Sequence, residues 1–159
     1  MSLEKLKTAQ ELASIRDGLE AEGRKLVFTN GCFDLLHVGH VRYLQQAREL
    51  GDALVVALNG DASVRALKGQ TRPINSERDR AEVLAGLECV TYVTIFPSIR
   101  VTELVGAVRP QVYAKGGDYT VESLNREERV ALEAAGSRIC ILALVPGKST
   151  SAIIGKWKS

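Results

Sequence analysis

The segment KLVFTNGCFDLLHVGH, residues 25–40, decides the fold of this chain. Its first five residues, 25–29, form a short apolar run of strand length, which leads directly into a polar loop that contains glycine. After the loop, the apolar residues Val41, Leu44 and Ala47 recur at helical spacing. This order predicts a strand, a loop and a helix, with the loop at the carboxyl end of the strand.

The same strand-to-helix alternation continues along the chain. We predict further strands at 53–58, 91–96, 111–115 and 138–145, and helices at 62–67, 76–89, 101–108, 125–135 and 149–158. Alternating strands and helices are typical of an α/β fold with a parallel sheet. We therefore predict one Rossmann-like domain at 25–159, with a doubly wound, mostly parallel five-stranded sheet and helices on both faces. An amphipathic helix over 3–22 precedes it and defines a separate N-terminal segment, 1–24.

Composition excludes several other classes of protein. The 159 residues suit one domain, and 45% hydrophobic with 25% charged residues is ordinary for a globular protein. A formal net charge of +2 is too balanced for a nucleic-acid binder that works by charge. No apolar run approaches the ~20 residues of a membrane span. Three scattered cysteines indicate reduced thiols, so we expect a cytoplasmic protein without membrane or nucleic-acid partners.

Both histidines of the chain lie in the loop of the opening segment. If a helix begins near Val38, His40 falls in its first turn and His37 just before it. A helix N-terminus offers free N–H groups and a positive dipole end, which together favour phosphate, and Gly39 lets the backbone approach closely. A packed or solvated histidine pair is the simpler interpretation, but the position at a strand end favours function. A zinc site is disfavoured because the spacing is not HExxH and no third ligand is evident.

In open α/β sheets the ligand binds beyond the carboxyl ends of the strands. The polar loops at those ends are residues 30–40, 59–61, 115–118 and 147–151, and we expect them to meet. Two phosphate-binding alternatives fail. The Gly147-Lys148-Ser149 stretch lacks the earlier glycine of a P-loop, because Leu142 stands there. The loop after the first strand also lacks the GxGxxG pattern of dinucleotide-binding proteins.

The loop sequence NGCFDLLHVGH, residues 30–40, resembles the HxGH signature of the cytidylyltransferase-like nucleotidyltransferases. The resemblance covers about residues 25–156. Two later motifs, KGGDY at 115–119 and GKSTS at 147–151, resemble the branch that adenylates D-glycero-β-D-manno-heptose 1-phosphate. In many bacteria this unit resembles the C-terminal half of a bifunctional protein with a sugar kinase. A chain of this length has no room for that kinase, so the resemblance implies a stand-alone transferase and a separate heptose kinase.

The resemblance also implies roles for matched residues. His37, His40 and Lys68 would be catalytic, with the histidines stabilising charge on the phosphates. The implied nucleotide-binding residues are Thr29, Asn30, Gly31, Cys32, Phe33, Asp34, Gly39, Arg80, Lys115, Gly116, Gly117, Asp118, Gly147, Ser149 and Thr150. The implied residues around the acceptor substrate are Asp34, Asn59, Asp61 and Lys68. Mg²⁺ is expected with ATP, held through the phosphates with help from Asp34, and no residue is assigned as a dedicated metal ligand.

The reaction implied is ATP plus heptose 1-phosphate giving ADP-heptose and pyrophosphate, a step toward lipopolysaccharide. A second hypothesis is a CTP-dependent enzyme acting on glycerol 3-phosphate or phosphoethanolamine. Ala152 weakens it, because related cytidylyltransferases often carry arginine there. A third hypothesis, from another class, is a nucleotide-binding regulatory module without turnover. The oligomeric state stays open, although an apolar face on the first helix would suit a homodimer.

Overall fold

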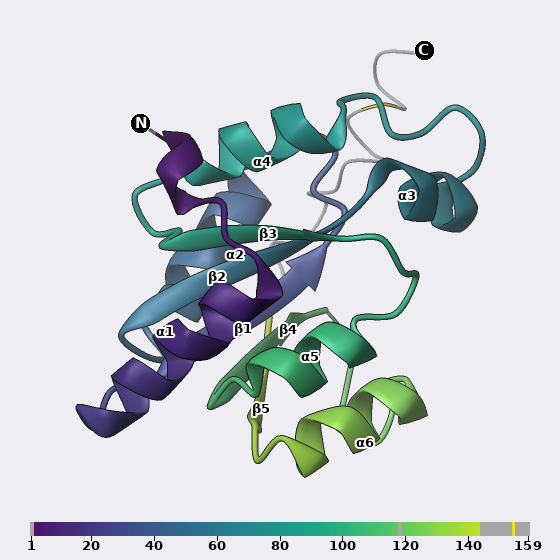
Figure 1. The fold of residues 1–159 in the computed structure, drawn as a ribbon. Coiled ribbons are helices and arrows are strands. Elements are labelled where there is room, and N and C mark those ends of the chain that lie inside the picture. The colour runs from purple at the N-terminus through teal and green to yellow at the C-terminus, as the bar shows by residue number, and fades with distance from the viewer. Residues whose placement is uncertain (1, 118, 144–153, 155–159) are drawn as a thin grey trace.

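The computed structural model describes residues 2–117, 119–143 and 154 (Figure 1). At its centre is a sheet of five strands: β1 (Leu26–Gly31), β2 (Ala53–Asn59), β3 (Tyr92–Phe96), β4 (Val112–Gly116) and β5 (Arg138–Leu142). Their order across the sheet is β3-β2-β1-β4-β5, and every neighbouring pair is parallel. The predicted α/β fold is confirmed, and the sheet is entirely rather than mostly parallel.

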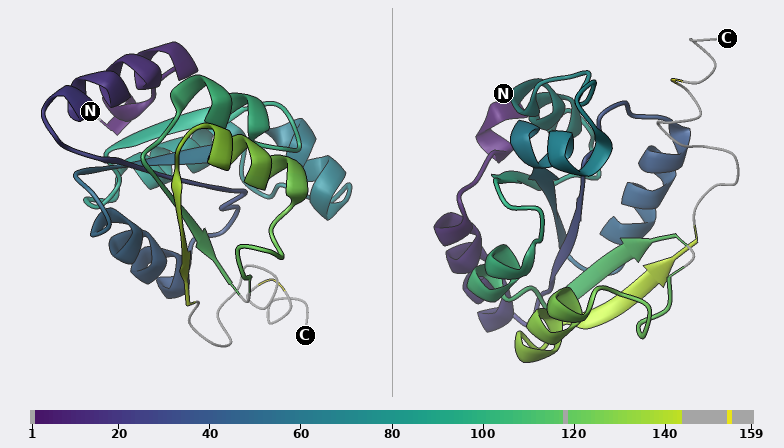
Figure 2. Two further views of the ribbon diagram at one scale, coloured as in Figure 1. Left: turned by 90° about the horizontal axis from the view of Figure 1, so that it is seen from below. Right: turned by 90° about the vertical axis from the view of Figure 1, so that its right-hand side faces the viewer.

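Helices cover both faces of the sheet (Figure 2). They are α1 (Ala9–Ala21), α2 (Val38–Arg48), α3 (Asp61–Lys68), α4 (Glu77–Ala85), α5 (Thr102–Val108) and α6 (Arg126–Ala134). Side chains of α2 and α4 share one core cluster with the strands, and side chains of α1, α5 and α6 share the other. The predicted final helix at 149–158 falls on residues outside the described part, apart from Ile154, which is helical.

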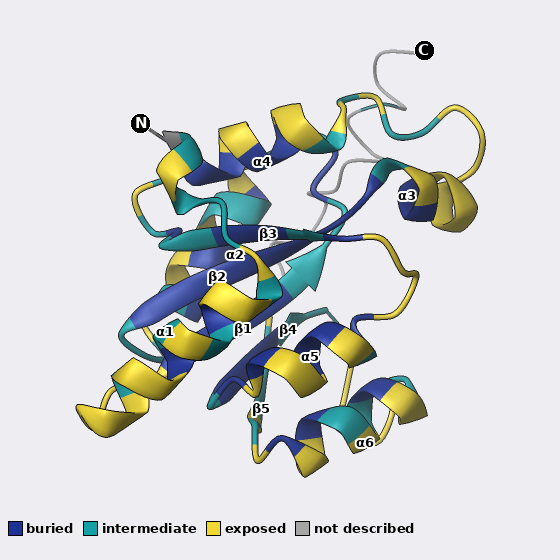
Figure 3. Cartoon of the chain, in the orientation of Figure 1, coloured by how far each residue is buried: buried dark blue, intermediate teal, exposed yellow. Residues whose placement is uncertain are grey.

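The central strand β2 shows why the sequence requires two covered faces. All seven of its residues are buried (Figure 3). Leu54, Val56 and Leu58 belong to the cluster under α2 and α4, whereas Ala53, Val55 and Ala57 belong to the opposite cluster. Because successive side chains of a strand point to opposite faces, a continuous apolar run needs a hydrophobic layer on each side.

The N-terminal segment differs from the predicted single helix over 3–22. A 3₁₀ turn, Ser2–Lys5, comes first, and α1 begins only after the N-cap Thr8. Between them the chain is extended: Leu6 forms a parallel bridge with Val93, and the Lys7 amide donates to the Val93 carbonyl at 2.8 Å. The segment therefore covers part of the exposed edge of β3, an interaction that helical periodicity does not reveal.

The apolar face of α1 is covered by the rest of the chain. Leu12 is fully buried, and Ile15 and Leu19 pack against the same cluster as α5. The prediction of a homodimer through this face therefore loses its basis. The division of the chain at residue 24 stays a prediction. Among the described residues, no helix is long and apolar enough to cross a membrane.

Several helix ends follow the sequence signals. Ser76 and Asn125 cap α4 and α6 by accepting the amides of Asp79 and Glu128, as their spacing predicts. One helix end is a correction: α4 ends at Ala85 rather than near residue 89, because the chain turns there to bring Val90 into the core. The N-cap of α3 is Gly60, which leaves the Asp61 carboxylate for another partner.

Candidate active site

A cavity of about 540 Å³ opens at the carboxyl ends of β1, β2 and β4. From β1 the chain proceeds outward to β2 and β3, and then returns to the other side of β1 to form β4 and β5. The cavity thus lies where the strand order reverses, the usual ligand site of such sheets. Its volume falls within the range of roughly 300–1,000 Å³ that small-molecule sites occupy.

Helix α2 begins at the edge of this cavity, and His37 is its N-cap. The amide of Gly39 donates to Nδ1 of His37 at 3.0 Å, and the amide of His37 donates to Nδ1 of His40 at 3.3 Å. The two histidines therefore form a reciprocal capping box at the positive end of the helix dipole. The predicted helix start near Val38 is confirmed.

The two imidazole rings are stacked, with centroids 3.8 Å apart and an interplanar angle of 27°. Because each Nδ1 accepts a backbone N–H, the neutral form of each ring carries its proton on Nε2. Burial, followed by the neighbouring His37, lowers the pKa of His40 to about 4. At neutral pH His40 is therefore an uncharged ring with an Nε2–H group available as a donor.

The loop after β1 supports this ring through Phe33 and Gly31. The Phe33 ring lies 5.2 Å from the His40 ring, centroid to centroid, and its backbone has a positive φ of 47°. A Cβ on Gly31 would stand 2.8 Å from the Phe33 ring, closer than packed carbon atoms approach. Glycine at position 31 therefore allows Phe33 to fold back against His40. This packing is a structural reason for glycine at this position, separate from any contact with the nucleotide.

Two buried tyrosines fix the loop and α2 to the neighbouring strand β4. Tyr43 of α2 donates to the carbonyl of Ala114 at 2.9 Å, so its oxygen accepts from the Thr29 hydroxyl at 2.7 Å. Tyr113 of β4 donates to Oδ1 of Asn30 at 2.5 Å. Burial, more than the charge of Glu128, raises the pKa of Tyr113, so it stays a neutral donor. Thr29 thus helps to join β1 to α2 through Tyr43. Asn30 instead lines the cavity, and Tyr113 fixes the orientation of its side-chain amide.

Arg80 of α4 is buried behind the cavity, with 2% of its surface exposed. Its Nε donates to the carbonyl of Asn75, Nη1 to the carbonyls of Cys32 and Asn59, and Nη2 to Oδ1 of Asp61 at 2.8 Å. One guanidinium therefore joins the ends of β1 and β2 to α3 and to the loop before α4. The resemblance implied a nucleotide contact for Arg80; in this structure its donors are engaged by the protein.

Asp34 has a comparable scaffold role on the cavity wall. Its carboxylate accepts the amides of Ile74 and Asn75 and Nε of Arg72, all within 2.9 Å. Burial alone raises the pKa of Asp34, but the Asn75 and Ile74 amides and the Arg72 guanidinium outweigh it, and the pKa lies below its ordinary value. Asp34 is thus an ionised anchor for the loop before α4, rather than a carboxylate with unoccupied lone pairs for phosphate-bound magnesium.

Charged groups from α3, β4 and α6 complete the lining. Lys68, at the end of α3, and Lys115, at the end of β4, both reach the cavity, and Nζ of Lys115 lies 4.9 Å from the Tyr119 ring centroid. Glu128 also lines it, with a side chain about nine-tenths buried and Nη1 of Arg100 at 3.8 Å. Such a site offers cations for phosphate and one buried acceptor for hydroxyl or amino groups.

The cavity brings most of the described candidate residues together. Those that line it are Asn30, Gly31, Cys32, Phe33, Asp34, His37, Gly39, His40, Asn59, Lys68 and Lys115. Thr29, Asp61, Arg80, Gly116 and Gly117 lie behind or beside it and are not among its lining residues. The remaining candidates, Asp118, Gly147, Ser149 and Thr150, lie outside the described residues.

Nine of the described lining residues had no site role predicted from the sequence: Tyr43, Leu67, Arg72, Ile99, Arg100, Tyr119, Leu124, Asn125 and Glu128. Tyr119 and Asn125 carried a signal, the first as the end of the KGGDY motif and the second as a helix cap. Leu67 ends the predicted helix at 62–67, and Arg72 lies in the stretch between it and the next predicted helix. Glu128 belongs to the same cap pattern as Asn125, but this pattern does not indicate a site role. Ile99 and Arg100 have no local pattern, because they reach the site only through the packing around α5.

Residues 28–154 match the profile of the cytidylyltransferase-like family. The chain belongs to this family. The match contains most of β1, the loop and the helix that carry the histidine pair, as well as the ends of β2 and β4. Membership identifies the chain as a nucleotidyltransferase and makes the cavity around His37 and His40 its candidate active site.

Among curated proteins, the chain is 51% identical over 150 residues to the bifunctional protein HldE of Pelobacter propionicus, and 52% identical over 155 residues to that of Geotalea uraniireducens. These alignments cover 94% and 98% of this chain but only 30% and 31% of the relatives. The chain thus spans about a third of the length of the curated relatives that it matches.

Solved structures share the fold. A lipopolysaccharide core biosynthesis protein from Thermoplasma volcanium has a TM-score of 0.64 and 26% identity, with 77% of this chain and 98% of that chain covered. Pantoate-β-alanine ligase from Francisella tularensis has a TM-score of 0.59 and 15% identity, covering 92% of this chain and 68% of that chain. The second likeness concerns the fold alone and supports the Rossmann-like assignment.

Proposed function

We propose that this nucleotidyltransferase transfers AMP from ATP to D-glycero-β-D-manno-heptose 1-phosphate, giving ADP-heptose and pyrophosphate. The observation that carries the proposal is the histidine pair, held as a reciprocal cap at the N-terminus of α2 and facing a cationic cavity. The choice of substrate is supported by the ordered motifs of the sequence and by the high identity to HldE proteins. The similar lipopolysaccharide core biosynthesis protein supports the same metabolic context.

The proposed step is a direct displacement at the α-phosphorus of ATP. A phosphate oxygen of the sugar 1-phosphate forms a bond to this phosphorus while the bond to the bridging oxygen breaks, and pyrophosphate leaves with that oxygen. The attacking oxygen is already ionised, so no residue needs to form a covalent adduct. The barrier is instead repulsion between two polyanions and the charge that develops on the leaving group.

The lining residues suit this electrostatic task. His40 remains neutral at pH 7 and donates from Nε2 without first losing a proton, and its ring is fixed by the His37 amide and by Phe33. Lys68 and Lys115 approach the cavity from the β2 and β4 sides, where they would attract the phosphates of the two substrates. Preorganised donors of this kind typically contribute about 3–4 kcal/mol each to transition-state stabilisation.

Magnesium is proposed to enter as part of the MgATP substrate, where it would neutralise phosphate charge. Among residues 2–117, 119–143 and 154, no cluster of three or more histidine, cysteine, aspartate or glutamate side chains could hold a metal ion. Asp34, the carboxylate suggested by the resemblance, already accepts three protein donors. We therefore assign the described residues to the phosphates and derive no step through the metal.

We further propose a cytoplasmic location, because ATP and sugar phosphates are made there, and a separate kinase that supplies the heptose 1-phosphate.

Pyrophosphate release tests the central proposal. ATP and CTP are each supplied, with magnesium, together with heptose 1-phosphate, glycerol 3-phosphate or phosphoethanolamine. Release with ATP and heptose 1-phosphate alone is expected. Release with CTP and another acceptor would contradict the substrate assignment, and no release with any pair would favour a binding module without turnover.

A further inference from the structure

Arg72, which the sequence analysis did not assign to the site, lines the cavity from the loop between α3 and α4. Its side chain is 13% exposed, and Nε donates to Oδ2 of Asp34 at 2.7 Å. We propose that Arg72 is a phosphate-binding residue of this cavity, positioned by Asp34, with a phosphate monoester or the end of a polyphosphate as its ligand. The proposal deepens the proposed function and rests on it for the identity of the substrates.

Asp34 holds the loop before α4 without needing Arg72. The amides of Ile74 and Asn75 bind its carboxylate directly, at 2.8–2.9 Å. The side chain of Asn75 also donates to the backbone carbonyl of Asp34 at 2.9 Å. Three hydrogen bonds from Ile74 and Asn75 therefore hold the loop against Asp34. The Arg72 guanidinium adds a further contact that is not needed to hold it.

The guanidinium of Arg72 also keeps N–H donors that no described residue uses. Among the described residues, Nε is the only guanidinium nitrogen of Arg72 with a protein hydrogen-bond partner. A guanidinium carries five N–H donors in a fixed plane, so four are left on Nη1 and Nη2 beside the cavity. Arg80 provides the contrast, because all three of its nitrogens donate to protein oxygens. Arg80 is built as a scaffold, whereas Arg72 presents unused donors to a ligand.

The charge of the cavity wall also favours an anionic ligand. Among the described residues, four cationic side chains line the cavity, those of Lys68, Arg72, Arg100 and Lys115, against the two carboxylates of Asp34 and Glu128. Asp34 is turned toward its own loop, and Glu128 lies beside Arg100. On the side of the cavity formed by the chain after β2, the charges of Lys68 and Arg72 therefore have, among the described residues, no neighbouring carboxylate directed at the cavity. This positive side favours an anionic ligand. A planar fork of N–H donors matches the oxygens of phosphate.

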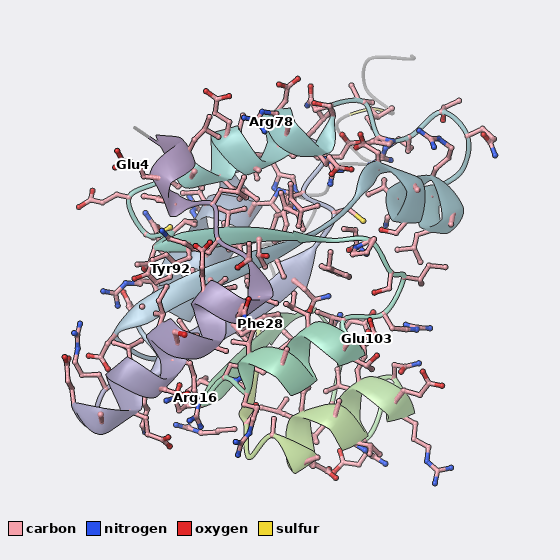
Figure 4. The ribbon with its side chains drawn as sticks, viewed as in Figure 1. Glu4, Arg16, Phe28, Arg78, Tyr92 and Glu103 are labelled. Atoms are coloured by element: carbon pink, nitrogen blue, oxygen red, sulfur yellow. The ribbon has the colours of Figure 1, made fainter. Side chains whose placement is uncertain are left out.

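The test combines anion binding with steady-state kinetics. Arg72→Gln removes the charge, Arg72→Lys keeps the charge but loses the fork, and Arg78→Gln is the matched control. Arg78 lies exposed on α4 (Figure 4) and is not among the residues that line the cavity. Calorimetric titration with pyrophosphate and with inorganic phosphate measures binding without turnover. The KM values for ATP and for heptose 1-phosphate then identify which substrate supplies the phosphate. Circular dichroism and thermal melting check that each variant folds.

We expect Arg72→Gln to weaken anion binding and to raise KM for one of the two substrates by at least about tenfold. Arg72→Lys should fall in between, because a lysine cannot donate to Asp34 and bind a phosphate with a planar fork at once. Unchanged anion binding and KM values in a folded Arg72→Gln would overturn the proposal, as would an equal loss in Arg78→Gln. If the wild type releases no pyrophosphate but Arg72→Gln still weakens anion binding, the proposed reaction fails and the phosphate site stands.

Discussion

His37 and His40 present stacked rings at the start of α2, and each ring accepts a backbone amide on Nδ1. The helix cap and the candidate catalytic pair are therefore one structure. An amide that would otherwise lack a partner in the first turn fixes each ring, and the fixed ring then directs Nε2 as a donor. This coupling means that changes to either histidine should affect both local stability and turnover.

Replacement of His40 with alanine should lower kcat by about 10²–10³-fold, the usual cost of removing one preorganised donor to a developing charge. KM for ATP should change much less, because the donor is expected to act mainly in the transition state. Pyrophosphate release under saturating substrates measures the effect. Val83→Ala, on the exposed side of α4, is a control for general perturbation. A His40→Ala enzyme with a near-normal kcat would contradict the assigned role.

The lowered pKa of His40 predicts a pH dependence of stability. The unfolded chain has an ordinary histidine pKa of about 6.5, whereas the folded value is about 4. Between these values the unfolded state binds more protons, so stability should fall as the pH is lowered from about 6.5 to about 4. Asp34 affects stability at lower pH. Because its pKa is depressed in the folded state, the stability that it contributes is lost only as the pH falls below about 4.

Urea midpoints at pH 7.0, 5.5 and 4.5 test this dependence. The wild type should lose more stability between pH 7.0 and 5.5 than His40→Asn, which keeps a polar side chain but cannot titrate. Equal losses in the two proteins would show that other groups control this range.

Arg80 should prove more important for the fold than any other arginine in the site. Arg80→Ala would leave the carbonyls of Cys32 and Asn59 without their donor, and would leave Asp61 without its cation. Loss of one member of such a buried network typically costs about 3–5 kcal/mol. Asp61→Asn should cost far less, because its side chain is 33% exposed and the amide oxygen can still accept. Chemical denaturation measures both, and a mild Arg80→Ala would refute the scaffold role.

The contrast between Arg80 and Arg72 shows where sequence reasoning stops. The strands, the loop after β1 and the helix start at Val38 could be predicted, because apolar periodicity and capping are local properties. The scaffold role of Arg80 could not, since its acceptors lie 5, 19, 21 and 48 residues away. Arg72 reaches Asp34 across 38 residues for the same reason. Which arginine is buried and which faces the cavity depends on how α3 and α4 pack.

The single helix predicted for the N-terminal segment is wrong for a related reason. Leu3, Leu6, Leu12, Ile15 and Leu19 have near-helical spacing, but Leu6 belongs to a bridge with β3 rather than to α1. Thr8, within the predicted helix, is a good N-cap residue, and it marks the true start of α1. Capping residues inside a periodic stretch thus carry information about helix starts that apolar spacing alone does not.

Tyr113→Phe should show whether Tyr113 positions the Asn30 side chain for substrate binding or only stabilises the fold. The change removes the hydrogen bond to Oδ1 of Asn30 and leaves the ring packed near Phe28, with centroids 6.2 Å apart. We expect a loss of about 1 kcal/mol in unfolding free energy. Because Asn30 lines the cavity, its amide would lose its fixed orientation, and KM for ATP should rise while the fold is retained. Tyr92→Phe on β3 is the matched control, and equal kinetic effects in both variants would argue against positioning through Asn30.

Gly31→Ala tests whether the loop after β1 must let Phe33 fold back beneath His40. The added Cβ would meet the Phe33 ring at 2.8 Å, so the ring must move, and the face of His40 that it supports becomes free. We expect kcat to fall by about tenfold or more, since small displacements of catalytic groups are costly. The double variant Gly31→Ala, Phe33→Ala relieves the clash but not the lost support, so it should remain impaired. Recovery of kcat in the double variant would show that the clash, and not support of His40 by Phe33, limits turnover.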